Sequence, residues 1–202
     1  ERPDAERVSG PVISGELHPF QGEISESVRA ILSAGGRGVI DLPTGAGKTR
    51  VAIESILLHA RERKSLGTVL WLAERDELCE QAVTQWLQLW RAKGLVDTDL
   101  TVLRYWGGRQ PARTDTKDVV VVTTRQQLTN RVKRADAQWL RSAELVVIDE
   151  AHHSTARTYL DIVRWLADRE GATAPVLGLS ATPFRSDAER SEHLARLFDR
   201  SL

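Results

Sequence analysis

The sequence has 202 residues, of which 41% are hydrophobic and 28% are charged, a composition typical of a soluble globular protein. Its 28 basic and 28 acidic residues balance, which argues against strong non-specific binding of nucleic acid by the whole surface. The single cysteine, Cys79, excludes an internal disulfide and a multi-cysteine zinc site, and no apolar run approaches the ~18 residues that a membrane helix needs. We therefore expect a cytoplasmic protein without membrane contact, associated with the nucleoid if it is bacterial. Because the sequence contains no methionine, we also expect it to be part of a longer protein.

Taken in chain order, the sequence predicts a loose lead-in followed by alternating helices and strands. Residues 1–16 are polar and carry two prolines and two glycines, so we expect them to lack regular structure. We expect helices over residues 22–34, 47–62, 76–91, 125–133 and 156–169, and strands over 37–42, 68–73, 100–106, 118–124, 144–150 and 175–181. The strands are apolar throughout, which predicts burial on both faces, and their alternation with helices predicts a mostly parallel sheet with right-handed crossovers. The predicted fold class is α/β, a three-layer α/β/α sandwich that binds its ligand at the carboxyl ends of the strands.

A glycine-rich stretch, "DLPTGAGKTR" at residues 41–50, follows the first of these strands and leads into a helix. A phosphate-binding loop requires this context, because glycines let backbone N–H groups converge on phosphate oxygens and the helix N-terminus attracts the same anion. Lys48 is predicted to reach the β- and γ-phosphates, and the Thr49 hydroxyl to ligate Mg²⁺. The predicted nucleotide-binding residues of the loop are Pro43, Thr44, Gly45, Ala46, Gly47, Lys48 and Thr49. The first glycine of the general pattern G-x-x-x-x-G-K-[ST] is Leu42 here, so the alternative is a simple strand-to-helix turn.

Two acids, Asp149 and Glu150, emerge at the carboxyl end of the apolar strand in "ELVVIDEAHH". We expect Asp149 to hold Mg²⁺ through water, and Glu150 to orient or deprotonate the attacking water. His152 is expected to form a hydrogen bond near the γ-phosphate. The alternative is a metal site at His152 and His153, but adjacent residues point in different directions and no third ligand has a suitable spacing.

Together these elements resemble the first motor lobe of a superfamily 2 helicase. The stretch "LPTGAGKT" resembles motif I, "LAERDELCEQ" motif Ia, "VVVTTRQQL" the motif Ib region, "DEAHH" motif II and "LSATPFR" motif III, while "HPFQ" resembles the upstream glutamine element. The order and spacing fit over roughly residues 17–190 and are most similar to XPB-type and RadD-type repair helicases and the motor subunits of restriction enzymes. The resemblance implies a RecA-like P-loop NTPase domain whose nucleic-acid-stimulated ATP hydrolysis drives translocation or strand separation.

The resemblance also implies a role for each matching residue. Gln21 is expected to read the adenine edge, and Ser180 and Thr182 are expected to couple the ATP site to the nucleic-acid face. The catalytic residues implied are Lys48, Asp149 and Glu150, the last as the base. Contacts with the sugar-phosphate backbone are implied for Arg75, Thr123, Thr124 and Arg125.

Residues 104–141 carry nine basic and three acidic side chains, a net charge of +6, so the rest of the chain carries −6. Charge alone indicates a solvated face, but the stretch overlaps the motif Ib match, which favours a nucleic-acid-facing role for part of it. The basic residues nearest Trp106 are Arg104, Arg109 and Arg113. Trp106 itself either stacks on a base or packs at the end of a strand.

The family implied by the resemblance needs a second RecA-like lobe, which carries the arginine fingers and half of the nucleic-acid track. We expect residues 17–184 to form the first lobe and residues 185–202 to form one charged helix leading to a missing second lobe. The chain is thus expected to bind ATP and Mg²⁺, to hydrolyse ATP slowly by itself, and to act on nucleic acid, with DNA favoured over RNA. Two alternatives are an ATP-gated nucleic-acid clamp or scaffold with little turnover, and a nucleotide kinase, which would need a base-binding lid and has no use for "SATPFR".

Overall fold

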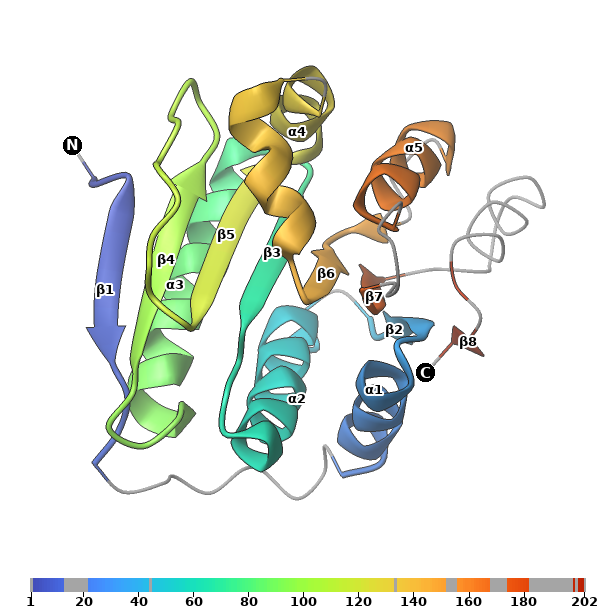
Figure 1. Ribbon diagram of the computed structural model, residues 1–202. Helices are drawn as coiled ribbons and strands as arrows, with labels where there is room; N and C mark the ends of the chain where they lie inside the picture. The colour runs from blue at the N-terminus through green and yellow to red at the C-terminus, as the bar shows by residue number, and fades with distance from the viewer. Residues whose placement is uncertain are drawn as a thin grey trace.

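A computed structural model describes residues 2–12, 22–43, 45–132, 134–151, 156–167, 174–181, 198 and 200–201. Within these residues, eight strands form one sheet in the order β1-β4-β5-β3-β6-β7-β2-β8 (Figure 1). The strands are β1 (Ala5–Ser9), β2 (Arg37–Asp41), β3 (Thr68–Ala73), β4 (Asp99–Tyr105), β5 (Val119–Thr124), β6 (Leu145–Ile148), β7 (Val176–Ser180) and β8 (Arg200–Ser201). Neighbouring strands are parallel except that β1 runs antiparallel to β4, so the mostly parallel sheet is confirmed.

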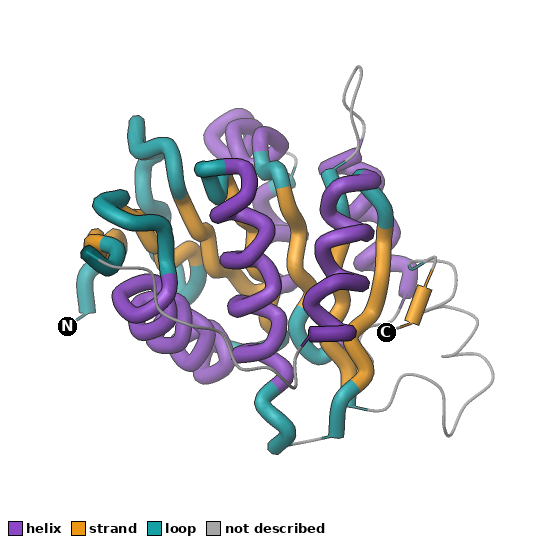
Figure 2. Tube along the Cα trace, turned by 90° about the horizontal axis from the view of Figure 1, so that it is seen from below, coloured by secondary structure: helices purple, strands orange, loops and turns teal. Residues whose placement is uncertain are grey.

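Helices cover both faces of this sheet, as Figures 1 and 2 show from two directions. They are α1 (Gly22–Ala34), α2 (Lys48–Arg63), α3 (Asp76–Lys93), α4 (Arg125–Arg131), the 3₁₀ helix η2 (Ala135–Ser142) and α5 (Ala156–Ala167). Buried side chains of α1, α2 and α3 form one apolar cluster with the sheet, and those of α4, η2 and α5 form a second cluster. In β3, Val69 and Trp71 belong to the first cluster while Leu70 and Leu72 belong to the second, because successive strand residues point to opposite faces. The predicted three-layer α/β/α sandwich is confirmed.

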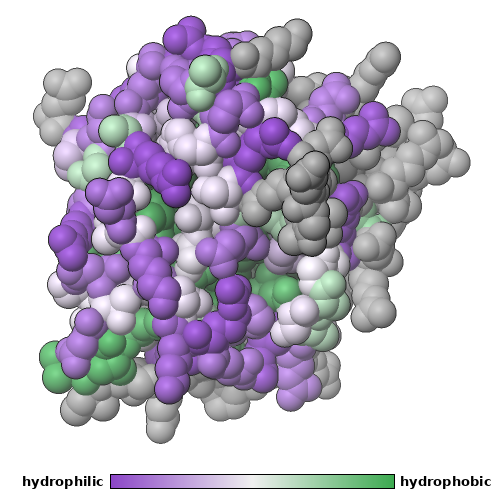
Figure 3. Space-filling model, in the orientation of Figure 1, coloured by the Kyte–Doolittle hydropathy of each residue, from purple (hydrophilic) through white to green (hydrophobic). Residues whose placement is uncertain are grey.

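The predicted elements agree closely with the observed ones. The helix at 22–34 and the strand at 68–73 match at both ends, and the other predicted elements in the described residues differ by one or two residues at an end. The sequence analysis did not predict η2. Among the described helices, none is both long and apolar enough to cross a membrane. The face seen in Figure 3 is predominantly hydrophilic, and the exposed large hydrophobic side chains of the described residues are Val12 and Val96.

The N-terminal strand β1 corrects the prediction that residues 1–16 form a loose lead-in. It pairs with β4 from Ala5 opposite Leu103 to Ser9 opposite Asp99. Val8 is the one buried residue of β1, so the segment carries no apolar pattern that would indicate a strand. Backbone pairing with β4 and ion pairs hold it at the edge of the sheet instead.

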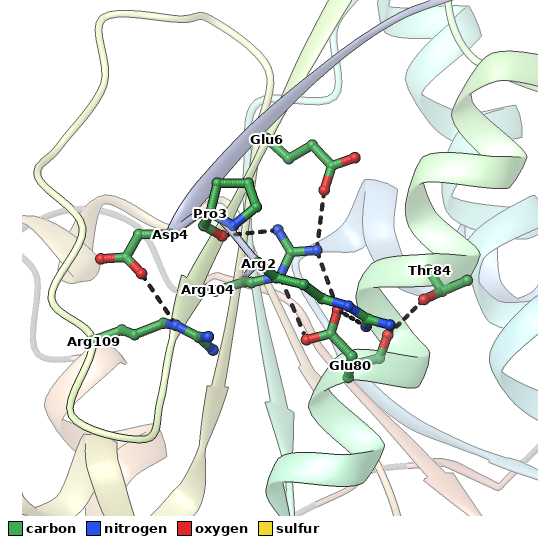
Figure 4. A network of polar contacts seen from close by, with 8 residues as sticks. All are labelled: Arg2, Pro3, Asp4, Glu6, Glu80, Thr84, Arg104 and Arg109. Atoms are coloured by element: carbon green, nitrogen blue, oxygen red, sulfur yellow. Dashed lines mark hydrogen bonds and ion pairs between the residues drawn. The ribbon is translucent and has the colours of Figure 1, made fainter.

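Arg104 of β4 is the centre of the polar network that anchors this N-terminal segment (Figure 4). The residue is only 2% exposed. Its guanidinium donates to the Pro3 carbonyl at 3.1 Å and lies 3.0 Å from a Glu6 carboxylate oxygen and 3.2 Å from one of Glu80. Arg2 also pairs with Glu80. Because Glu80 belongs to α3, one network joins the N-terminal segment, β4 and α3.

The C-terminal residues correct a second prediction. Residues 200–201 form β8, which pairs in parallel with Gly38 and Val39 of β2. The charged helix predicted for residues 185–202 is therefore wrong at these two positions, and residues 185–197 lie outside the described residues. Phe198 packs on β7, where a Cβ added to Gly178 would lie 2.6 Å from its ring. A larger residue at position 178 would require the Phe198 ring to shift.

Candidate active site

The loop between β2 and α2 turns sharply at two glycines. Gly45 and Gly47 have φ angles of 82° and 78°, in the left-handed region that residues with a Cβ disfavour. Nothing in the described structure lies within 4 Å of a Cβ built at either position, so the backbone conformation rather than crowding selects glycine there. Gly47 is also the N-cap of α2 and supplies no side-chain cap. An anion can take the place of that cap, because the first N–H groups of a helix have no intrahelical partner.

A cleft of about 230 Å³ opens beside this loop. The loop and the start of α2 contribute Gly45, Gly47, Lys48 and Thr49 to its lining, and the end of β6 contributes Asp149 and Glu150. Lys48 is buried and close enough to Asp149 to lower the pKa of that carboxyl. The structure thus brings together two motifs that lie about a hundred residues apart in the sequence. They meet because the carboxyl ends of parallel strands lie at the same end of a sheet.

Asp149 is only 6% exposed and follows the last residue of β6. Its backbone N–H donates to the Leu72 carbonyl at 2.8 Å, which continues the pairing of β6 with β3. Burial, and then the charge of Glu150, raise the pKa of the Asp149 carboxyl to about 6, while the Glu150 N–H and Lys48 act in the opposite direction. Desolvation of this kind leaves a carboxylate in need of a nearby cation.

Glu150 has a φ of 50°, in the left-handed region, although it is not a glycine. A residue with a Cβ pays about 1–2 kcal/mol for this conformation. Its backbone N–H donates to Asp149 Oδ1 at 3.0 Å, which stabilises the turn. Strained backbone of this kind tends to occur where a side chain must be aimed at a functional site.

Ser180, at the end of β7, lies directly beside the start of the phosphate loop. It is opposite Asp41 in the pairing of β7 with β2, and its carbonyl accepts a hydrogen bond from the Leu42 N–H at 3.1 Å. The coupling role of Ser180 stays a prediction.

The oxygen atoms at the cleft fit a hard divalent cation. Thr49 offers a hydroxyl and Asp149 a buried carboxylate whose ionised form needs a positive charge. The described residues contain no group of three or more His, Cys, Asp and Glu side chains that could hold a metal ion. Mg²⁺ takes one or two protein oxygens and completes its shell with water and phosphate, so the expectation that Thr49 and Asp149 hold Mg²⁺ stays a prediction.

The residues predicted to contact nucleic acid differ in how exposed they are and in the hydrogen bonds they form. Thr123 is fully buried, and its hydroxyl donates to the Tyr105 carbonyl at 2.6 Å, so the predicted direct contact needs correction. Thr124 caps α4 by accepting a hydrogen bond from the Gln127 N–H at 3.2 Å. Arg75 is exposed at the start of α3, beyond the carboxyl end of β3. Arg125 is half-buried at the start of α4.

The basic stretch at residues 104–141 is only partly available to a nucleic acid. Arg104 is buried in the network described above, and Arg109 pairs with Asp4 at 3.1 Å and lies over the Trp106 ring at 5.7 Å. Trp106 is 3% exposed, so it is a packed aromatic at the end of β4 and does not stack on bases. Arg113 remains exposed in the segment that follows β4.

One wall of the cleft was not predicted from the sequence. It is formed by a single stripe of α3, namely Leu78, Gln81, Ala82 and Gln85. The i, i+3, i+4 and i+7 spacing is a helical face and could have been read from the sequence, but nothing there shows that this face meets the phosphate loop. Cys79 on the same helix is fully buried, and burial raises the pKa of its thiol, so it does not act as a thiolate nucleophile.

Four predicted site residues, Gln21, Thr44, His152 and Thr182, lie outside the described residues. The same holds for His153 and for the alternative of a metal site formed with His152. Their assignments stay predictions.

Comparison with known proteins agrees with this geometry. A family model for the res subunit of type III restriction enzymes matches residues 14–185. IRC3 of Saccharomyces cerevisiae, named as an ATP-dependent helicase, is 31% identical over 173 residues, 83% of this chain and 23% of that protein. The DNA 3'-5' translocase XPB2 of Sulfurisphaera tokodaii is 28% identical over 180 residues, 86% of this chain and 32% of that protein. The crystal structure of the Hef helicase domain of Pyrococcus furiosus superposes with a TM-score of 0.68 at 24% identity, covering 92% of this chain and 38% of that one. The chain thus spans about a quarter to a third of the length of these two relatives.

Proposed function

This chain belongs to the family of type III restriction enzyme res subunits, whose matched domain is the N-terminal lobe of superfamily 2 helicases, and we propose that it is the ATP-binding lobe of a nucleic-acid-dependent motor. The observation that carries the proposal is the cleft in which the phosphate loop faces the two acids after β6. A phosphate site alone would support many P-loop functions, but the paired acids opposite it supply what hydrolysis needs.

Each residue of the cleft has a role that follows from its chemistry. Lys48 neutralises the charge of the β- and γ-phosphates, and the N-terminus of α2 supplies N–H donors to the same oxygens. Thr49 and Asp149 would hold Mg²⁺, which when bound supplies positive charge against the phosphate oxygens. Glu150, which lines the cleft next to Asp149, accepts a proton from the water that attacks the γ-phosphate.

We propose DNA as the polymer and a second lobe as the partner that completes the site. XPB2 carries the name of a DNA translocase, which favours DNA. Arg75 is exposed at the start of α3, beyond the carboxyl end of β3, where its guanidinium can reach a phosphate backbone. Arginine fingers from a second lobe raise the rate of hydrolysis by about 10³–10⁵ in NTPases.

The test measures ATP hydrolysis by the full-length protein without polymer and with single-stranded DNA, duplex DNA or RNA. We expect stimulation by DNA and its loss in Lys48→Ala. Glu150→Gln should retain ADP binding while losing hydrolysis, which separates the catalytic role of the base from nucleotide affinity. Intact nucleotide binding without stimulation by any polymer would contradict the motor and leave an ATP-gated clamp.

A further inference from the structure

Two glutamines of α3 line the cleft, at its border with a neighbouring cavity that they also line. Gln81 and Gln85 are one turn apart on the stripe that lines it. The lining across from them consists of Lys48, Thr49, Asp149 and Glu150 together with the loop glycines. These are the groups that hold phosphates and a cation, so the glutamines lie at that end of the nucleotide rather than at the base.

The carbonyl oxygen of Gln85 is buried and has no hydrogen-bond partner among the described residues. Buried amide oxygens are normally paired, and an unpaired one indicates that a partner such as a water or a ligand belongs nearby. No hydrogen bond to either polar atom of the Gln85 amide is found among the described residues, so none fixes which of the two atoms faces the cleft. The amide can present either a donor or an acceptor to the cleft.

The helix that carries these glutamines is fixed to its surroundings at both ends. Near its start, Glu80 pairs with Arg104 and Arg2. Near its end, Lys93 Nζ lies 2.9 Å from the buried carboxylate of Glu54 in α2, the helix that begins with Lys48. The stripe of α3 is therefore held at a defined position relative to the phosphate loop, as a positioning residue requires.

We propose that Gln85, assisted by Gln81, is a positioning residue for the hydrated Mg²⁺–phosphate end of the nucleotide. Its amide oxygen accepts hydrogen bonds from water of the cation's shell, and its N–H₂ group donates to the carboxylates after β6. The proposal rests on the proposed function, because it requires that the cleft takes a nucleotide with Mg²⁺. It adds a residue of α3 to a site otherwise formed by the loop and β6.

The test measures equilibrium binding of a fluorescent ADP by the full-length protein over a range of Mg²⁺ concentrations and in its absence. In Gln85→Ala, the Mg²⁺ concentration that gives half of the maximal effect on ADP binding should rise about tenfold. Loss of an outer-shell partner lowers metal affinity by about 10–100-fold, and we expect the low end of this range. ADP binding without Mg²⁺ should change little. Gln85→Glu should shift the Mg²⁺ midpoint to lower concentrations and weaken binding without Mg²⁺, because its added negative charge attracts the cation and repels phosphate.

Gln88→Ala is the matched control, because Gln88 is one turn further along α3, is exposed, and lines a neighbouring cavity rather than this cleft. Its Mg²⁺ midpoint should equal that of the wild type. Equal midpoints in the wild type and both Gln85 variants would overturn the inference while leaving the proposed function intact. A loss of ADP affinity that is equal with and without Mg²⁺ would also overturn the inference, since it indicates a general structural defect of the variant. No ADP binding by the wild type would instead overturn the proposed function.

Discussion

Thr123 and Arg104 show how residues that suggest nucleic-acid binding can have structural roles. Both are polar side chains in or near motif matches, and both are buried with their polar groups satisfied. Each joins neighbouring elements: Thr123 connects β5 to the end of β4, and Arg104 connects β4 to β1 and α3. A motif match fixes which residue type is present, but burial decides which partners that residue can reach.

Thr123→Val tests this assignment directly. The substitution removes the hydroxyl that donates to the Tyr105 carbonyl and leaves that carbonyl buried. We expect the free energy of unfolding to fall by about 1–2 kcal/mol, as for loss of one buried hydrogen bond. Urea denaturation measures this change. Polymer affinity of the folded full-length variant should be unaltered.

Arg75→Ala provides the comparison for that measurement. Arg75 is exposed, so its loss should weaken polymer binding while changing stability by less than about 0.5 kcal/mol, as surface substitutions do. If Thr123→Val weakened polymer binding as much as Arg75→Ala, Thr123 would have a role beyond the hydrogen bond seen here.

At the scale of elements, periodicity predicted the interior of the sheet but not its edge. Val69 to Leu72 are apolar without a break because both faces of β3 are covered, and such a run can be recognised in a sequence. The edge strand β1 buries only Val8. It is held by backbone pairing with β4, which is distant in the sequence, and by the ion pair that joins Arg2, just before β1, to Glu80 of α3. Those partners depend on the tertiary fold. The same limit explains why Gln85 was missed, since its role depends on how α3 packs beside α2.

The ion network at β1 predicts a pH dependence of stability. Burial by itself raises the pKa of Glu80, but hydrogen bonds and charges from Arg104 and Arg2 outweigh it, so the pKa in the folded protein is below its ordinary value. A carboxyl with a depressed folded pKa stabilises the fold fully above its unfolded pKa of about 4.3 and loses that contribution as pH falls through the folded pKa.

Glu80→Gln should therefore lower the free energy of unfolding at pH 7 by about 1.5 kcal/mol, the low end of the range for hydrogen bonds to a charged group, because Glu80 is partly exposed. The difference from the wild type should shrink as the pH is lowered below about 4, where the wild-type carboxyl takes up a proton. Denaturant titrations at several pH values measure both effects. Glu77→Gln, exposed on the same helix, is the control and should change stability little. A gap between wild type and Glu80→Gln that stayed constant down to pH 2 would contradict the ion pairing.

At the scale of the whole molecule, one sheet brings the phosphate loop, the two acids and Ser180 together at the carboxyl ends of its strands, and α3 adds one wall of the cleft. β2 leads into the phosphate loop, β6 into the two acids and β7 into Ser180. The described residues of this chain supply the phosphate loop and the two acids of the cleft. For hydrolysis we propose that the site depends on arginines of a second lobe, since the chain spans 23% of IRC3 and 32% of XPB2.

The 202-residue chain and the full-length protein should therefore differ in turnover far more than in affinity. We expect them to bind ADP with dissociation constants within about threefold of each other, because the same residues contact the phosphates in both and no new contact forms. ATP hydrolysis by the isolated chain should be slower by about 10³–10⁵, the contribution of arginine fingers, and should not respond to DNA. Fluorescent ADP binding and steady-state phosphate release measure the two quantities side by side. If the isolated chain hydrolysed ATP at the full-length rate, the groups that stabilise the transferring phosphoryl would have to lie within these residues, and the second lobe would serve only to grip the polymer.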